Sequence, residues 1–114
     1  MRMWNVPVEI LCRQHLLGEH NETHAFIGCM KKGTSLKGYI EKGLVEVQNI
    51  KKRHDELSEE MVKRGYRHLS PLEQNICYDA GYVNSEQNIN ELRDRCEKCK
   101  ERIERRIEKN ECFN

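Results

Sequence analysis

Apolar residues recur every three or four positions along three long stretches of the chain, the spacing of helices that each bury one face. One stretch predicts a helix over residues 7–26, and another predicts a helix over residues 85–109 that Asn84 or Ser85 would cap. The clearest stripe predicts a helix over residues 44–64. It consists of Leu44, Val47, Ile50, His54, Leu57 and Met61. The helix predicted over residues 85–109 is expected to bury a stripe of Ile89, Leu92, Cys96, Cys99, Ile103 and Ile107.

The segments between these stretches predict one or two short helices. Thr34 or Ser35 can cap a short helix that ends at Gly43. Residues 70–73, Ser-Pro-Leu-Glu, form a capping box with proline in the first turn, which predicts a helix to about Tyr78. We therefore expect an all-α, compact single domain of three principal helices plus one or two short helices.

The composition agrees with a single helical domain over residues 1–114. Charged residues make up 34% of the chain and aromatic residues 6%, with only two prolines. The chain has neither an apolar run of the roughly 18 residues that cross a membrane nor a signal-peptide h-region. We expect a monomer without a membrane partner that is intracellular and cytoplasmic, in the host cell if the protein is viral. Its six cysteines are then expected to be thiols.

Charge is distributed unevenly along the chain, although the formal net charge is only +1. Residues 1–70 carry 12 basic and 9 acidic side chains, whereas residues 71–114 carry 8 and 10. Residues 31–67 alone carry 10 basic and 6 acidic side chains. A surface that binds a polyanion is therefore expected within 31–67.

The first predicted helix carries three ionisable residues on the face that should be buried. His15, Glu19 and Glu22 lie at positions i, i+4 and i+7, on the apolar stripe of Val8, Leu11 and Phe26. Burying an unpaired carboxylate costs several kcal/mol, so the stripe indicates a charge network, a metal or a cleft, of which we favour the cleft. His15 is either an active-site partner or a core histidine that Glu19 satisfies.

The amino terminus is expected to lie close to the start of the first helix. Asn5 can cap that helix, and Pro7 in its first turn loses no hydrogen bond. Met1 is expected to be retained because the large Arg2 follows it. An α-amino group has a pKa of about 7.7–8.0, far below that of a lysine, so a useful fraction is an unprotonated nucleophile at neutral pH.

Two motifs, QHLLGEHNE at residues 14–22 and RHDELSEEMVKRGY at residues 53–66, carry a family resemblance. Together they resemble the pyrimidine-dimer DNA glycosylase/AP lyase family, the phage-type UV repair endonuclease V. The motifs occur in the same order and at similar separation, and the likeness covers residues 1–67 well.

The resemblance implies a DNA repair glycosylase with abasic-site lyase activity on UV-induced pyrimidine dimers. Met1 would be the nucleophile, attacking the sugar carbon through its α-amine, expelling the damaged base and forming an imine before strand cleavage. Glu22 would stabilise the cationic imine and move protons. The partner would be double-stranded DNA with a dimer or abasic site, kinked or with a nucleotide extruded. No metal or organic cofactor is expected.

Contacts to the damaged strand are expected from basic and polar residues near the terminus and at loop ends. Asn21 stands where the family often has an arginine, and Ala25 where another basic residue would follow. The chain also ends with Phe113 alone instead of an aromatic, lysine-containing tail. The predicted substrate-binding residues are Arg2, His15, Asn21, Lys31, Lys32, Lys63 and Arg64.

Two alternatives stay open. The first is a catalytically repurposed member of the same fold that binds nucleic acid or a nucleotide. The second is a metal-dependent nuclease or structural zinc module built on His20, His24 and the cysteines. Cys96 and Cys99 stand at buried positions of the last stripe, which favours packed thiols, and their metal binding stays undecided.

Overall fold

The computed structural model describes residues 1–68, 70–72 and 78–111, the last four by their backbone alone. The predicted all-α class is confirmed, since the described residues contain helices and no strand. The elements are η1 (Val8–Ile10), α1 (Arg13–Lys31), α2 (Lys37–Glu41), η2 (Val47–Asn49), α3 (Ile50–Lys63), α4 (Ser85–Arg95) and α5 (Glu97–Glu111).

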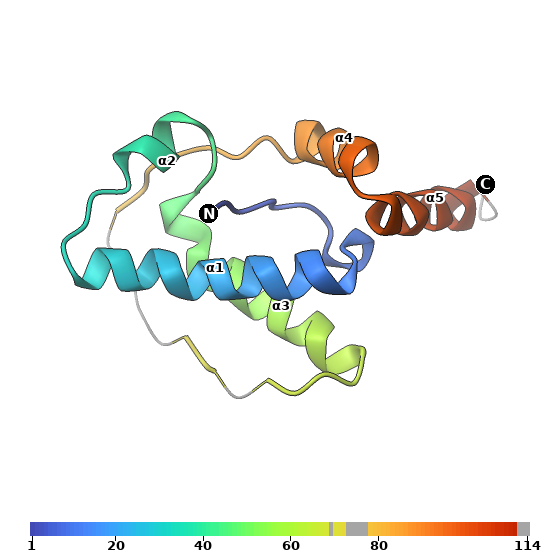
Figure 1. Ribbon diagram of the computed structural model, residues 1–114, viewed down its shortest axis with the longest axis horizontal. Helices are drawn as coiled ribbons and strands as arrows, with labels where there is room; N and C mark the ends of the chain where they lie inside the picture. Colours follow the sequence, from blue (N-terminus) through green and yellow to red (C-terminus); the bar gives the residue numbers. More distant parts are fainter. Residues whose placement is uncertain (69, 73–77, 112–114) are drawn as a thin grey trace.

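The helices α1 and α3 pack against each other and form the centre of the molecule (Figure 1). The N-terminal segment runs in extended form between α1 and α4, and α5 lies against α4 and η1. Two buried apolar clusters flank this segment. Met3 belongs to one of them, with Phe26, whereas Trp4 and Val6 belong to the other. The first residues of the chain are therefore part of the core.

The stripe predicted for residues 44–64 is confirmed over most of its length. Its residues from Val47 to Met61 are buried, while Leu44 is only partly buried. The helix begins later than predicted, because residues 47–49 form a 3-10 turn before α3 starts. Gly65 follows α3 with φ 84°, the left-handed conformation that commonly ends helices.

The prediction of a first helix over residues 7–26 is wrong at both ends. A 3-10 turn at 8–10 is followed by an extended Cys12, and α1 runs from Arg13 to Lys31. Asn5 does not cap a helix: its φ is 55°, and its Nδ2 donates to Glu46 Oε1 at 3.3 Å. The backbone N–H of Cys12 donates to Cys99 Sγ at 3.3 Å, a tertiary contact that a local pattern does not reveal.

The single helix predicted over residues 85–109 is also wrong, because the chain turns at Cys96. This residue is extended, with φ −132° and ψ 110°, and separates α4 from α5. The turn directs its sulfur toward Cys12 Sγ, 3.9 Å away. The predicted cap is confirmed, since the Asn84 side chain accepts the Gln87 N–H at 3.0 Å. Ile107 is 42% exposed, so the stripe is not buried to its end.

The predicted short helices have different outcomes. Helix α2 lies where one was expected, but its N-cap is Leu36 instead of Thr34 or Ser35, and the Lys37 N–H donates to Ser35 Oγ at 3.2 Å. Residues 70–72 and 78 are not helical, and 73–77, where the second was predicted, lie outside the described residues. No helix in the described part of the chain is both long and apolar enough to cross a membrane.

The segment that leads into α4 packs closely on the start of η2. The Val47 N–H donates to the Ala80 carbonyl at 2.9 Å, and the Val83 N–H donates to Glu46 Oε2 at 2.7 Å. Gly81 lies between them with φ 91°, and a Cβ there would clash with the Val45 carbonyl oxygen. Glycine is therefore required at this close approach.

Candidate functional site

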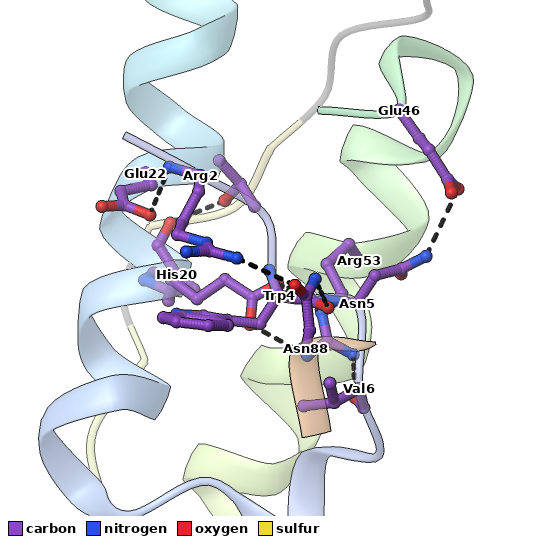
Figure 2. Close-up of polar contacts among 11 residues, drawn as sticks. Arg2, Trp4, Asn5, Val6, His20, Glu22, Glu46, Arg53 and Asn88 are labelled. Carbon is purple, nitrogen blue, oxygen red and sulfur yellow. Dashed lines mark hydrogen bonds and ion pairs between the residues drawn. The ribbon is translucent and has the colours of Figure 1, made fainter. Parts of the chain in front are cut away.

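The first residues of the chain are held by hydrogen bonds to their backbone. The Arg2 N–H donates to Glu22 Oε2 on α1 at 2.9 Å (Figure 2). The next amide, of Met3, donates to the Leu44 carbonyl at 2.7 Å. These two hydrogen bonds, one to α1 and one to Leu44, fix the backbone directly after the amino-terminal residue.

A buried ion pair holds the next part of this segment. Arg53 on α3 donates from Nε and Nη2 to the two oxygens of Glu19 on α1, at 2.6 Å and 2.9 Å, and both side chains are at most 2% exposed. Glu19 also accepts the backbone N–H groups of Trp4 and Asn5 at 3.1 Å and 3.3 Å. Arg53 Nη1 donates to the Val6 carbonyl at 2.7 Å. The charge network, not the favoured cleft, therefore explains Glu19.

The helix α4 supplies the third set of contacts to the segment. Asn88 Nδ2 donates to the Trp4 carbonyl at 2.8 Å, and its Oδ1 accepts from Arg2 Nη2 at 2.8 Å. Arg2 Nη1 pairs with Glu91 at 2.7 Å, and its guanidinium stacks 3.7 Å above the Trp4 ring. The Arg2 side chain is thus bound within the protein from several directions.

This arrangement brings the amino terminus close to Glu22. The carboxyl group of Glu22 is half-buried, and no described side-chain cation lies within 4.0 Å of it. Burial raises the pKa of Glu22 above its ordinary value, while the Arg2 N–H and the positive N-terminal amine act in the opposite direction. Burial that raises the pKa of a carboxyl group makes it a stronger base than an exposed carboxylate, which suits it to acid/base chemistry.

A cluster of four histidines lies between α1 and α3. His20 Nε2 is 3.2 Å from His54 Nε2, and the rings of His24 and His68 lie 5.0 Å and 4.8 Å from that of His20. Burial lowers the pKa of His20 to about 4, and the neighbouring histidines act in the same direction. Burial also lowers the pKa of His24 from its ordinary value.

The ring of His15 contacts two cysteines and Trp4. Its Nδ1 lies 3.2 Å from Cys12 Sγ and 3.4 Å from Cys99 Sγ, and its edge contacts the Trp4 ring. Glu19, the carboxylate that sequence reasoning offered as its partner, is bonded to Arg53 instead. His15 and Glu22 lie on the same helix, seven residues or about 10 Å apart along its axis.

The remaining predicted substrate-binding residues do not converge on one surface. Lys31 and Lys32 are exposed at the end of α1, and Lys63 is exposed at the end of α3, on opposite sides of the molecule (Figure 1). Arg64 pairs with a neighbouring glutamate at 2.8 Å and donates to a backbone carbonyl of η1 at 3.1 Å. Asn21 is exposed on α1, directly before Glu22.

A polar hollow of about 440 Å³ lies beside the N-terminal segment. Arg2 lines it together with Lys42, Tyr82 and Asn88, among other residues. Lys42 is a basic residue that sequence reasoning did not select. Glu22 is not part of the lining of this hollow.

Sequence reasoning missed the residues that hold the terminus. Glu19 was noted as an ionisable residue on an apolar face, and Arg53 opens the second motif, but their pairing across 34 positions was not predicted. Asn88 and Glu91 gave no signal, because a polar residue on a helix is ordinarily solvated.

Comparison with known proteins gives one match. A family model described as pyrimidine dimer DNA glycosylase matches residues 1–74, about two thirds of the chain. Neither the curated proteins nor the solved structures contain a match. The matched part includes the N-terminal segment, α1 and α3, and ends before α4.

Proposed function

The chain belongs to the pyrimidine dimer DNA glycosylase family, and from this premise we propose that it excises dimers and cleaves the resulting abasic site through its N-terminal amine. Met1 is the nucleophile and Glu22 is the acid/base and charge partner. Double-stranded DNA with a pyrimidine dimer or an abasic site is the substrate.

The observation that carries this proposal is the hydrogen bond of 2.9 Å from the Arg2 N–H to Glu22. The α-amine belongs to Met1, the residue directly before Arg2, and its positive charge favours the ionised form of Glu22. The hydrogen bonds of Met3 and Trp4 restrict the path of the chain behind that amine. Such preorganisation lowers the entropic cost of aligning a nucleophile with its target.

The proposed reaction uses these two groups in succession. The uncharged amine of Met1 attacks C1′ of the sugar, and the C1′–N bond of the damaged base breaks as the base leaves with a proton. The sugar ring opens to a protonated imine, whose positive charge Glu22 stabilises. Glu22 then removes a proton from C2′, and the electron pair expels the 3′ phosphate by β-elimination. Water finally hydrolyses the imine and restores the free amine.

The raised pKa of Glu22 supports its role as the group that removes a proton and later returns it. A half-buried carboxylate with a raised pKa accepts a proton more readily than an exposed one, and the protonated form can then return that proton in a later step. Glu19 is not a second candidate, because Arg53 and the amides of Trp4 and Asn5 occupy its oxygens.

The proposal is tested by replacing the carboxyl group while keeping its hydrogen-bonding shape. In Glu22→Gln we expect strand cleavage at an abasic site to fall by at least roughly 100-fold, the usual contribution of a general acid/base. Binding to the same duplex should persist. The matched control is Glu56→Gln, which changes an exposed glutamate on α3 and should cleave at the wild-type rate.

A second variant tests the amine independently. One alanine inserted before Met1 displaces the α-amine from Glu22, so we expect cleavage to be lost while folding and binding remain. Intact mass establishes that the tested wild-type protein begins at Met1. Wild-type cleavage rates in both the insertion and Glu22→Gln would exclude this mechanism.

A binding protein without catalysis is the second candidate, and the engagement of the predicted phosphate contacts favours it. Arg2 is bound to Glu91 and Asn88, and Arg64 to Glu60, so both side chains are already engaged within the protein. This candidate predicts that wild-type protein binds abasic DNA but neither cleaves it nor forms a borohydride-trapped adduct.

A further inference from the structure

Four metal-binding side chains from opposite ends of the sequence meet beside the start of α1. Cys12 and His15 come from the start of α1, and Cys96 and Cys99 come from the junction of α4 and α5. One ligand atom from each residue lies within 4.8 Å of all the others. The cluster is independent of the amine and Glu22 and lies outside the proposed reaction.

The separations within this cluster resemble the edges of a tetrahedral metal site. The Cys12 and Cys96 sulfurs are 3.9 Å apart, and His15 Nδ1 lies 3.2 Å and 3.4 Å from the sulfurs of Cys12 and Cys99. Tetrahedral zinc with bonds of about 2.3 Å to sulfur and about 2.0 Å to nitrogen requires sulfur–sulfur edges of about 3.8 Å and sulfur–nitrogen edges of about 3.5 Å. A disulfide needs sulfurs about 2.05 Å apart, and these cysteines are free.

The sequence spacing agrees with the same site. Cys12-x-x-His15 and Cys96-x-x-Cys99 are two ligand pairs, each separated by two residues, as in many structural zinc sites. Cys96 and Cys99 were named from the sequence as possible zinc ligands together with His20 and His24, and His15 was not selected as one. The extended turn at Cys96, which breaks the predicted helix, is what brings the second pair together.

The backbone around the cluster favours negatively charged sulfur. Cys12 is the N-cap of α1, and Cys96 directly precedes α5, so both sulfurs lie near the positive end of a helix dipole. The Cys12 N–H donates to Cys99 Sγ at 3.3 Å, and the Cys99 N–H donates to Cys96 Sγ at 3.5 Å. Outer hydrogen bonds of this kind orient thiolate ligands in metal sites.

We propose that Cys12, His15, Cys96 and Cys99 bind one zinc ion and thereby fasten the junction of α4 and α5 to the start of α1. Three sulfurs and one nitrogen complete a tetrahedral sphere and leave no open position for a substrate or water, so the ion is structural. Because His15 and Cys99 are 84 positions apart in the sequence, the ion closes a loop of more than 80 residues.

The metal also affects the proposed catalytic site at a distance. Helix α4 ends at Arg95, directly before the proposed ligand Cys96, and it carries Asn88, which binds the Trp4 carbonyl and Arg2. Fixing the end of α4 therefore limits the movement of the N-terminal segment. The ion takes no part in the chemistry itself.

Metal analysis of the whole protein tests this proposal. Protein purified without chelator, or refolded with zinc, should contain about one zinc ion per chain. Cobalt substitution should give thiolate-to-cobalt charge-transfer bands and the spectrum of a tetrahedral ion. X-ray absorption at the zinc edge should report three sulfur neighbours and one nitrogen neighbour. These measurements use wild-type protein and therefore do not depend on a variant that folds.

Variants then assign the ligands. Cys96→Ser and Cys99→Ser should each bind zinc at least roughly 100-fold more weakly, since even outer-shell partners contribute about 10-fold to 100-fold. Cys29→Ser removes a half-buried cysteine outside the cluster and should keep full zinc content. His68→Gln alters the separate group of His20, His54 and His68 and should also keep it.

Three results would overturn the proposal. Wild-type protein that neither contains zinc nor takes it up on refolding would exclude the site. Zinc with only nitrogen and oxygen neighbours, lost in His68→Gln, would assign the ion to the histidine cluster. An intact mass showing a disulfide between Cys96 and Cys99 in freshly purified protein would assign these sulfurs a redox role instead.

Discussion

The part of the chain that matches the family model and the part beyond it contribute differently to the same site. Residues 1–74 contain the terminal amine, Glu22 and the ion pair of Glu19 with Arg53. The helices α4 and α5 lie beyond the match, yet Asn88 reaches back to the N-terminal segment. The family part thus carries the proposed chemistry, and the remainder helps to hold its nucleophile in position.

The two parts also use different interactions to hold buried polar groups. Within the matched part, Arg53 and Glu19 form a charged pair whose remaining hydrogen bonds go to backbone groups of the N-terminal segment. Between the parts, this role falls to the partly exposed pair of Arg2 with Glu91, the side-chain amide of Asn88 and the proposed zinc site. Loss of the fully buried pair of Arg53 with Glu19 should therefore cost more stability than loss of the Asn88 contacts.

The largest effect is expected from Arg53→Met. It leaves the carboxylate of Glu19 buried without its partner, which should lower the free energy of unfolding by about 3–5 kcal/mol. Urea unfolding followed by circular dichroism measures this. Lys52→Met, an exposed change on the same helix, is the control and should stay within about 0.5 kcal/mol of wild type. Equal stability of the two variants would show that the pair does not hold the core.

A smaller effect is expected from acid acting on the histidine cluster. Because His20 has a pKa of about 4 in the folded protein and 6.5 as its ordinary value, the unfolded chain binds more protons between these limits. Stability should consequently fall as the pH is lowered from about 6.5 toward 4, by about 2 kcal/mol between pH 7.5 and pH 5.0.

Thermal unfolding across this pH range, with His20→Asn as the comparison, measures the contribution of the cluster. The variant should lose less stability on acidification, because asparagine does not titrate. An identical pH dependence in the two proteins would assign the acid sensitivity to other groups.

Asn88→Ala tests the contact between the two parts of the chain. It removes the hydrogen bonds to the Trp4 carbonyl and to Arg2, which should lower stability by about 1–2 kcal/mol. Cleavage at an abasic site should slow by about 10-fold or more, because the amine is less well positioned. Asn90→Ala, an exposed change on the same helix, is the control. Unaltered cleavage in Asn88→Ala would mean that α4 does not position the terminus.

The smallest effects are expected from the exposed lysines at the ends of α1 and α3. If both ends contact phosphates, Lys31→Ala and Lys63→Ala should each reduce the slope of log affinity against log salt by about 0.9. Lys31 ends α1 and Lys63 ends α3, so contacts to both require a DNA footprint that spans the two helix ends. Fluorescence anisotropy at several salt concentrations measures the slopes. A wild-type slope in either variant would show that the lysine replaced in it does not contact DNA.

The sequence predicts the helices of this protein better than their ends. The stripe of α3 follows helical periodicity closely, so its burial could be predicted from spacing alone. The breaks at Cys12 and Cys96 could not, because the stripe continues through both positions while contacts between distant residues reorient the backbone. Local pattern carries no information about such partners.

The site was only partly predictable for the same reason. Met1 and Glu22 were selected through the resemblance, and the anomalous position of Glu19 was visible in the stripe. The pairing of Glu19 with Arg53 and the reach of Asn88 depend on how the helices pack. Neither was predictable from residues that are 34 or 84 positions apart in the sequence.

The most direct measurement of the central claim is the identity of the atom that bonds to DNA. Wild-type protein is incubated with a duplex containing one abasic site, reduced with borohydride, digested, and mapped by mass spectrometry. The proposed mechanism predicts a single adduct on the α-amine of Met1. An adduct on a lysine such as Lys42, or strand cleavage without any trapped adduct, would contradict it.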